Sequence, residues 1–170
     1  MTITIRPLGP DDAEQYRACC LYVTQDAPTS LIPTYEEMEP RTVEMLRELF
    51  ISKISKPDVT FGAFDGEQLI GLTGIFREER QKRRHKMNLV SVFVRPEYRG
   101  KRVGFALVEA ALAYARTVEG VEHIELSVRS DNTPAKAIYT SFGFKTWGTE
   151  PAFLKLDGSR YDEDYMTLKL

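Results

Sequence analysis

The chain has 170 residues, which fits one domain over residues 1–170, and its 42% hydrophobic content is enough for a sizeable core. Its formal net charge of −2 argues against a protein that attracts nucleic acid through overall charge. The N-terminus shows no signal pattern and no apolar run is long enough to span a bilayer, so we expect a cytoplasmic protein without membrane contact.

The N-terminal segment predicts a strand followed by a helix. Residues 2–7 alternate apolar and polar side chains, which is typical of a half-buried strand. Asp11 or Asp12 can cap a helix that runs to about Tyr22. Residues 25–33 are rich in Pro, Thr and Ser and predict a loop.

A second helical region follows that loop. Glu37 stands three residues after Thr34, which is the spacing of a capping box. Pro40 interrupts the helix early, and an apolar helical pattern then continues to about Ile54.

The middle of the chain predicts a hairpin and a central strand. Strands over residues 59–64 and 68–76 flank Asp65-Gly66, a strong hairpin turn signal. Residues 77–86 form a polar, mostly basic run, which we interpret as a solvated hairpin tip. Residues 87–94 are apolar on both faces, as expected for a central strand.

The C-terminal half alternates helices and strands. A helix is predicted over residues 103–117 and a strand over 122–128. Asp131 or Asn132 can cap the next helix, which ends at Gly143. Closing strands are predicted over residues 144–147 and 165–170, with a turn at Asp157-Gly158 before the last one. The pattern as a whole predicts an α/β fold with a mixed, mostly antiparallel central sheet flanked by helices.

Cys19 and Cys20 are neighbours in a predicted helix and therefore point to different sides of it. A disulfide or a metal site at this pair is not expected. We interpret both cysteines as packing residues.

The turn between the central strand and the helix at residue 103 indicates an anion site. It reads Arg99-Gly100-Lys101-Arg102-Val103-Gly104, and its two glycines allow close approach of the backbone to a ligand. Free N–H groups at a helix start bind phosphate readily. The turn lacks the residues of a P-loop and of a dinucleotide fingerprint, and a purely structural need for glycine remains an alternative.

A second motif makes the pattern specific. Asn132, Ala135, Tyr139, Gly143 and Phe144 have the spacing of the second signature of the GNAT superfamily of acetyl-CoA-dependent N-acetyltransferases, which this chain resembles. The turn resembles the pyrophosphate loop of that family. The likeness extends over nearly the whole chain and implies a single GNAT domain. One difference is that Arg102 replaces the usual middle glycine, where we expect a helical or bridging conformation because φ > 0 is costly for Arg.

The resemblance implies that acetyl-CoA is the cosubstrate, with no metal. The turn would hold its pyrophosphate, and the edge of the preceding strand would pair with its pantetheine arm. Val94 would also offer its N–H to the thioester oxygen. The cofactor-binding residues implied in this way are Val92, Phe93, Val94, Arg99, Gly100, Lys101, Arg102, Val103, Gly104 and Asn132.

Two residues are candidates for proton transfer. Tyr139 stands where many family members place the acid that protonates the departing thiolate. A primary amine acceptor is mostly protonated at neutral pH and needs a base. Glu125 is our candidate, although a surface ion pair is the plainer interpretation of it. His85 acting through a water is an alternative base, and Asn132 is also interpretable as a helix cap alone.

The sequence therefore predicts an N-acetyltransferase in which an amine of a small molecule or peptide attacks the thioester directly in a ternary complex. A sensor that binds acyl-CoA without turnover is the main alternative. A nucleic-acid partner acting through residues 82–86 is a weaker one, and we expect none. The pattern is compatible with a homodimer.

Overall fold

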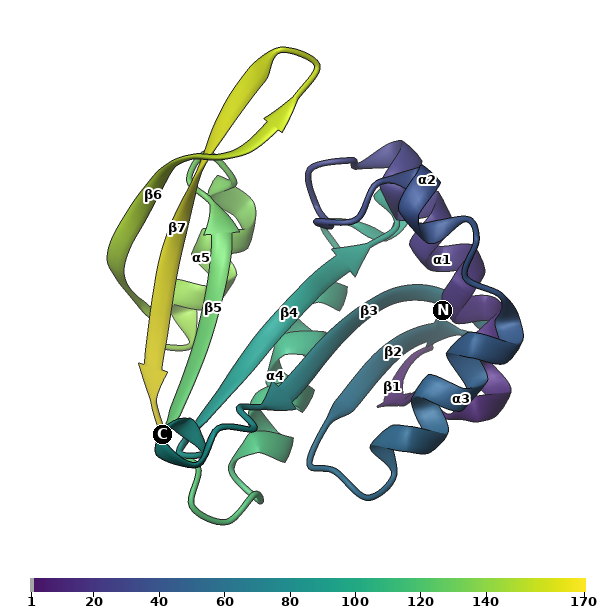
Figure 1. The fold of residues 1–170 in the computed structure, drawn as a ribbon, viewed down its shortest axis with the longest axis horizontal. Coiled ribbons are helices and arrows are strands. Elements are labelled where there is room, and N and C mark those ends of the chain that lie inside the picture. Colours follow the sequence, from purple (N-terminus) through teal and green to yellow (C-terminus); the bar gives the residue numbers. More distant parts are fainter. Residues whose placement is uncertain (1) are drawn as a thin grey trace.

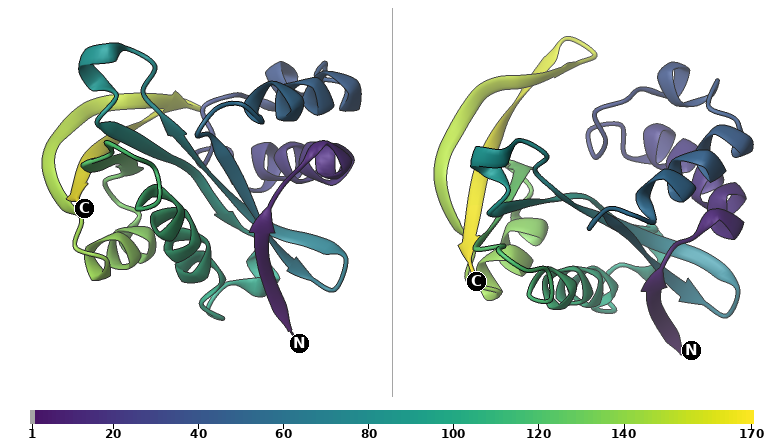
Figure 2. Two further views of the ribbon diagram at one scale, coloured as in Figure 1. Left: turned by 90° about the horizontal axis from the view of Figure 1, so that it is seen from below. Right: turned by 60° about the horizontal axis from the view of Figure 1, so that its bottom comes forward.

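The computed structural model describes residues 2–170, which form one seven-stranded sheet with helices on both faces (Figures 1 and 2). The spatial order of the strands is β1-β2-β3-β4-β5-β7-β6. All neighbours pair antiparallel except β4 and β5. The strands are β1 (Ile3–Pro7), β2 (Val59–Asp65), β3 (Gln68–Arg77), β4 (Lys86–Val94), β5 (His123–Arg129), β6 (Lys145–Leu156) and β7 (Ser159–Lys169). The predicted mixed, mostly antiparallel α/β fold is confirmed.

The helices cover the two faces of the sheet separately. Helices α1, α2 and α3 lie on one face, and α4 and α5 lie on the other (Figure 2). Each layer encloses its own apolar cluster, one around α1 and α3 and a larger one around α4, β5 and β7. The α-helices are α1 (Ala13–Asp26), α2 (Tyr35–Met38), α3 (Val43–Lys53), α4 (Val103–Ala115) and α5 (Thr133–Ser141). Short 3₁₀ turns are η1 (Pro10–Asp12), η2 (Gln81–Arg83) and η3 (Pro96–Tyr98).

Several local signals fold as the sequence predicts. The Thr34 N–H donates to Glu37 Oε2 at 2.8 Å, and the Glu37 N–H donates to Thr34 Oγ1 at 3.4 Å, which completes the capping box of α2. The hairpin between β2 and β3 turns at Asp65-Gly66, with φ +59° at the glycine. Cys19 and Cys20 are buried in the apolar cluster on the α1 face, as expected for packing residues.

The central pair of strands separates along its length. β4 pairs with β5 only over three positions, from Lys86–His123 to Asn88–Glu125, after which the two strands diverge (Figure 1). A register shift against β3 between Leu72 and Gly74 leaves an extra residue on β4, and Ser91 adopts φ +56° there. Such a bulge bends its strand. The result is an open edge on β4 in the middle of the sheet.

The closing strands are much longer than predicted. β6 and β7 pair from Lys145–Thr167 to Leu156–Ser159 and extend as a hairpin beyond the rest of the sheet (Figure 1). This length was not predicted because β6 is mostly exposed and contains Pro151. Neither an alternation of apolar and polar residues nor a high apolar content marks it as a strand. Among residues 2–170, no helix is long and apolar enough to cross a membrane.

Candidate active site

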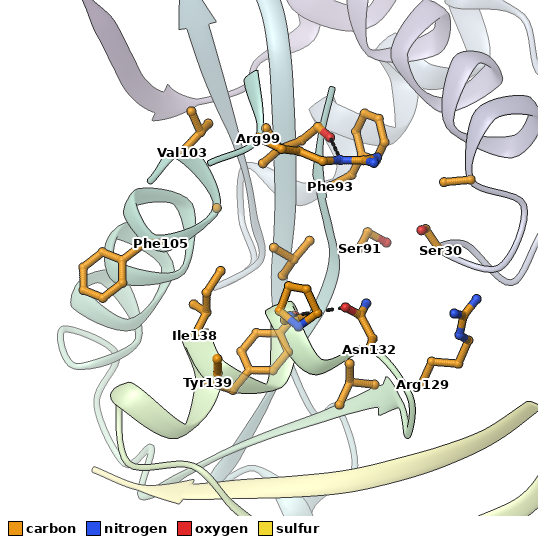
Figure 3. A pocket seen from close by; sticks show the side chains of 18 of the residues that line it. Ser30, Ser91, Phe93, Arg99, Val103, Phe105, Arg129, Asn132, Ile138 and Tyr139 are labelled. Atoms are coloured by element: carbon orange, nitrogen blue, oxygen red, sulfur yellow. Dashed lines mark hydrogen bonds between the residues drawn. The ribbon is translucent and has the colours of Figure 1, made fainter. Parts of the chain in front are cut away.

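A cavity of about 1020 Å³ occupies the gap between β4 and β5 and continues along the start of α4 and one side of α5 (Figure 3). Of the predicted cofactor residues, Val92, Phe93, Val94, Arg99, Gly100, Arg102, Val103, Gly104 and Asn132 line it. The Lys101 ammonium lies 5.1 Å from the centre of the Tyr98 ring, in the same turn. The structure thus gathers residues from three segments of the sequence around one space.

The turn before α4 places backbone donors at one end of this cavity. The first hydrogen bond of α4 runs from the Ala106 N–H to the Arg102 carbonyl at 3.0 Å, so the N–H groups of residues 103–105 precede the helical ladder. Gly104 contributes no side chain there, and an added Cβ would lie 3.5 Å from Ile138 Cδ1. These donors, together with the positive end of the helix dipole, form a site suited to phosphate.

The conformation that we expected for Arg102 is wrong. Arg102 adopts φ +62° and ψ 14°, which is the left-handed region and not a helical or bridging one. This conformation costs a non-glycine residue about 1–2 kcal/mol. The Arg102 guanidinium lies over the Phe105 ring at 4.5 Å, a cation–π contact that offsets part of this cost. The turn therefore keeps a geometry that favours glycine without having one at this position.

The exposed edge of β4 presents backbone groups to the cavity. The Phe93 carbonyl faces β3, because a Cβ added to Gly71 would lie 2.7 Å from its oxygen. Successive peptide groups of a strand point to opposite edges, so the N–H and C=O of Val94 face the gap toward β5. Arg99 reaches this edge, since its Nε donates to the Val94 carbonyl at 3.1 Å (Figure 3). Arg99 also lies 3.8 Å from Asp26.

Helix α5 supplies the opposite wall. Asn132 caps the helix, and its Oδ1 accepts a hydrogen bond from the Ala135 N–H at 3.2 Å. Tyr139 lies two turns later, buried against Phe144, with its ring in the cavity wall (Figure 3). Burial, together with the nearby Glu163, raises the pKa of the Tyr139 hydroxyl, which keeps it protonated at neutral pH.

Asp164 anchors the start of α5 to the sheet. Its carboxylate accepts hydrogen bonds of 2.7 Å from both the Ser130 and the Thr149 hydroxyl groups and forms a salt bridge with Lys136. These contacts lower the pKa of Asp164 to about 2. They join the loop before α5, the helix itself and strand β6 at one point, and so fix the wall that carries Tyr139.

Glu125 lies in a second, adjoining part of the cleft. A cavity of about 510 Å³ continues from the first across the face of the sheet that carries α1, and Glu125 lines it. The Glu125 carboxylate is 3.1 Å from the Arg83 guanidinium and forms a salt bridge with Lys86. The polar run that we interpreted as a solvated hairpin tip therefore supplies two cations to this carboxylate. His85 packs edge-on at 6.1 Å from His123.

Three further residues contribute to the cleft and were not predicted from the sequence. Glu163 of β7 lines both cavities, and Thr29 and Ser30 of the loop after α1 do so as well. Glu163 fell outside the predicted strand, which we started at Tyr165. The available signal was the two-residue period of β7, which places Glu163 on the same face as Tyr165. Among residues 2–170, no group of three or more His, Cys, Asp or Glu side chains is arranged to hold a metal ion.

Solved structures share this fold. A Streptococcus pneumoniae acetyltransferase of the GNAT family superposes with a TM-score of 0.92 at 21% identity, covering 99% of this chain and 100% of that one. The yncA protein of Salmonella typhimurium, solved with its cofactor acetyl-CoA, superposes with a TM-score of 0.86 at 16% identity over 99% of this chain and 94% of that one. At these identities the likeness concerns the fold.

Sequence relatives and a family model extend the likeness beyond the fold. N-alpha-acetyltransferase RimI of Mycobacterium tuberculosis is 30% identical over 131 residues, which is 70% of this chain and 80% of RimI. YwnH of Bacillus subtilis is 33% identical over 73 residues, which is 43% of this chain but only 44% of YwnH. The model of the acetyltransferase (GNAT) family matches residues 22–144, which include the open edge of β4, the turn before α4 and helix α5. Since the match covers well over half of the chain, this chain belongs to the GNAT family of acetyltransferases.

Proposed function

We propose that this protein transfers an acetyl group from acetyl-CoA to a primary amine, which attacks the thioester directly in a ternary complex. The observation that carries the proposal is the open edge of β4, with an anion-binding turn at one end and a buried tyrosine across the gap. The acceptor would be a small molecule or the amine of a peptide or protein.

The chain offers separate groups for each part of the donor. The N–H groups of residues 100–104 would hold the pyrophosphate, with charge added by Arg99, Lys101 and Arg102. The peptide groups of Val92 and Val94 face the gap and would pair with the pantetheine arm, whereas Phe93, whose carbonyl faces β3, lines the cavity beside them. Asn132 lies across the gap from this edge. At Gly104 a Cβ would keep an ordinary contact distance of 3.5 Å to Ile138 Cδ1, so only a larger side chain there would fill the path of the arm.

The proposed chemistry needs a polarised carbonyl, a proton for sulfur and a base for the amine. The Val94 N–H would stabilise the oxyanion as negative charge develops on the thioester oxygen. Tyr139, held protonated by its raised pKa, would give its proton to the departing thiolate. Glu125 reaches the acceptor side of the cleft and remains a candidate for the base, with its carboxylate between Arg83 and Lys86.

The test combines a binding and a turnover measurement. Acetyl-CoA is titrated into the protein by calorimetry, and free thiol is then followed with a panel of primary amines and peptides. Binding together with thiol release on at least one amine supports the proposal. Binding without release on any acceptor favours the sensor, and absence of binding refutes the assignment of the cavity.

A further inference from the structure

Glu163 is a buried carboxylate at the junction of the two cavities. The residue is 8% exposed, and it lines both the cavity that faces Tyr139 and the one that opens on the acceptor side. It projects from β7, directly opposite Arg129 of β5. A side chain in this place can contact groups that enter the cleft from either end.

The charged neighbours of Glu163 leave its carboxylate available. The Arg129 guanidinium donates hydrogen bonds to Asp131 at 2.6 and 3.1 Å and also contacts Thr29. Its hydrogen bonds are therefore made to residues other than Glu163. On β6, Glu150 accepts a hydrogen bond from the Tyr165 hydroxyl.

Two further ionisable groups, Asp164 and Tyr139, lie near Glu163. Asp164, the next residue of β7, points to the opposite face and bonds Lys136. Tyr139 of α5 interacts with Glu163 through space. The Glu163 carboxylate itself accepts a hydrogen bond from Ser127, which leaves acceptor positions for an incoming ammonium.

Glu125 differs from Glu163 in this respect. The Arg83 guanidinium lies 3.1 Å from the Glu125 carboxylate, and Lys86 bonds its other oxygen. Both oxygens of Glu125 are therefore occupied by cations of the chain itself, which an incoming ammonium would have to displace. The two acids therefore have different environments within one cleft, and only Glu163 also faces the cavity that holds Tyr139.

We propose that Glu163 is the catalytic base, which binds the acceptor ammonium at the junction of the two cavities and removes its proton. The inference rests on the proposed acetyl transfer. One proton passes from the ammonium to Glu163 and on to solvent. The nitrogen lone pair then forms the C–N bond, and the C–S bond breaks. The thiolate takes the Tyr139 proton, and the proton lost from nitrogen after attack restores the Tyr139 hydroxyl.

Burial supports this role. The low-polarity surroundings raise the pKa of Glu163 more than the hydrogen bond from Ser127 and the charge of Arg129 lower it. The nearby carboxylates of Asp164 and Glu150 also raise this pKa. A raised pKa makes a carboxylate a better base near neutral pH. Ionised Glu163 also helps to raise the pKa of Tyr139. The two groups are therefore suited to hold opposite protonation states when catalysis begins.

The experiment measures kcat and kcat/KM against pH for the wild type, Glu163→Gln, Glu163→Asp and Glu125→Gln, with the amine that gives the fastest thiol release in the wild type. We expect Glu163→Gln to lower kcat at pH 7 by about 100-fold and to abolish the fall of activity on the acidic side. Glu163→Asp should lower kcat but keep that acidic fall, because it keeps a carboxylate one methylene further away. Glu125→Gln should still lose activity as the pH is lowered, as the wild type does.

A second acceptor separates proton removal from ammonium binding. Trifluoroethylamine is mostly unprotonated at neutral pH, so the loss caused by Glu163→Gln should shrink several-fold with this amine. A loss of the same size with both amines contradicts proton removal by Glu163.

The remaining outcomes are distinct. If Glu163→Gln keeps the wild-type rate and pH profile, Glu163 is not the base. The same conclusion follows if Glu125→Gln is the variant whose activity no longer falls at low pH. Failure of the proposed function gives another result, namely no thiol release by the wild type on any amine. Circular dichroism and acetyl-CoA titration check the folding of each variant, and Glu163→Asp carries the test alone if Glu163→Gln does not fold.

Discussion

Replacing Asp164 by Asn should destabilise the protein in a pH-dependent manner. The Asp164 side chain is 8% exposed and accepts hydrogen bonds from Ser130, Thr149 and Lys136. These partners lower its pKa from 3.8 to about 2. A difference of this size between the unfolded and folded chains corresponds to about 2 kcal/mol of folding free energy at neutral pH.

The sign of the pH dependence follows from the lowered pKa. The stabilisation is fully present above the unfolded pKa near 4 and is lost as the pH falls through the folded pKa near 2. At pH 7 we expect Asp164→Asn to reduce the free energy of unfolding by about 2 kcal/mol, or Tm by about 4–8 °C. At pH 3 the difference from the wild type should be about half as large.

Urea unfolding followed by circular dichroism at pH 7, 4 and 3 measures this difference. Asp162→Asn is a matched control on the same strand, because Asp162 is exposed and Asn can still accept the 2.8 Å hydrogen bond from the Ala152 N–H. The control should change stability by less than about 0.5 kcal/mol. A difference between Asp164→Asn and the wild type that stays constant from pH 7 to pH 3 would refute the reasoning.

Three further variants test the cleft and the sheet. Tyr139→Phe should lower kcat by about 10–100-fold while the acetyl-CoA affinity in calorimetry stays near the wild type, and full activity would remove Tyr139 from the mechanism. Gly104→Trp should weaken acetyl-CoA binding by at least about tenfold. Gly104→Ala should not, because an added Cβ keeps ordinary contact distances of 3.5 Å or more. Equal acetyl-CoA affinities of the two variants would place the cosubstrate elsewhere. Gly71→Ala should cost about 1–3 kcal/mol in urea unfolding, since its Cβ would lie 2.7 Å from the Phe93 oxygen, whereas Gly148→Ala, with open space around it, should cost less than about 1 kcal/mol.

Local signals in the sequence predicted most elements because the relevant interactions are local. The capping box at Thr34 and Glu37, the turn at Asp65-Gly66 and the cap at Asn132 each involve residues only a few positions apart. The resemblance of two motifs to the GNAT family implied that the turn, the β4 edge and α5 belong to one site, and the cavity brings these segments together.

Features that depend on distant partners were not predicted. The length of β6 follows from its pairing with β7, and its bulge near Ala152 (φ +54°) has no mark in the sequence. An ion pair of Glu125 was the plainer interpretation of the sequence and is confirmed, but its partners Lys86 and Arg83, 39 and 42 positions away, were not predicted. The left-handed backbone at Arg102 contradicted an expectation based on residue type alone, because the surrounding turn determines that conformation.

The open edge of β4 separates two kinds of recognition within one cleft. Along this edge the groups that face the gap are peptide N–H and C=O groups, which nearly every amino acid carries, so substitutions there leave the pattern of donors and acceptors intact. In the smaller cavity the lining is made by individual side chains such as Trp147, Tyr165 and Glu125, and each substitution changes its shape or charge. With donor and acceptor bound as proposed, a lineage with this architecture could exchange one acceptor for another through a few surface mutations without rebuilding the half of the site proposed for the donor.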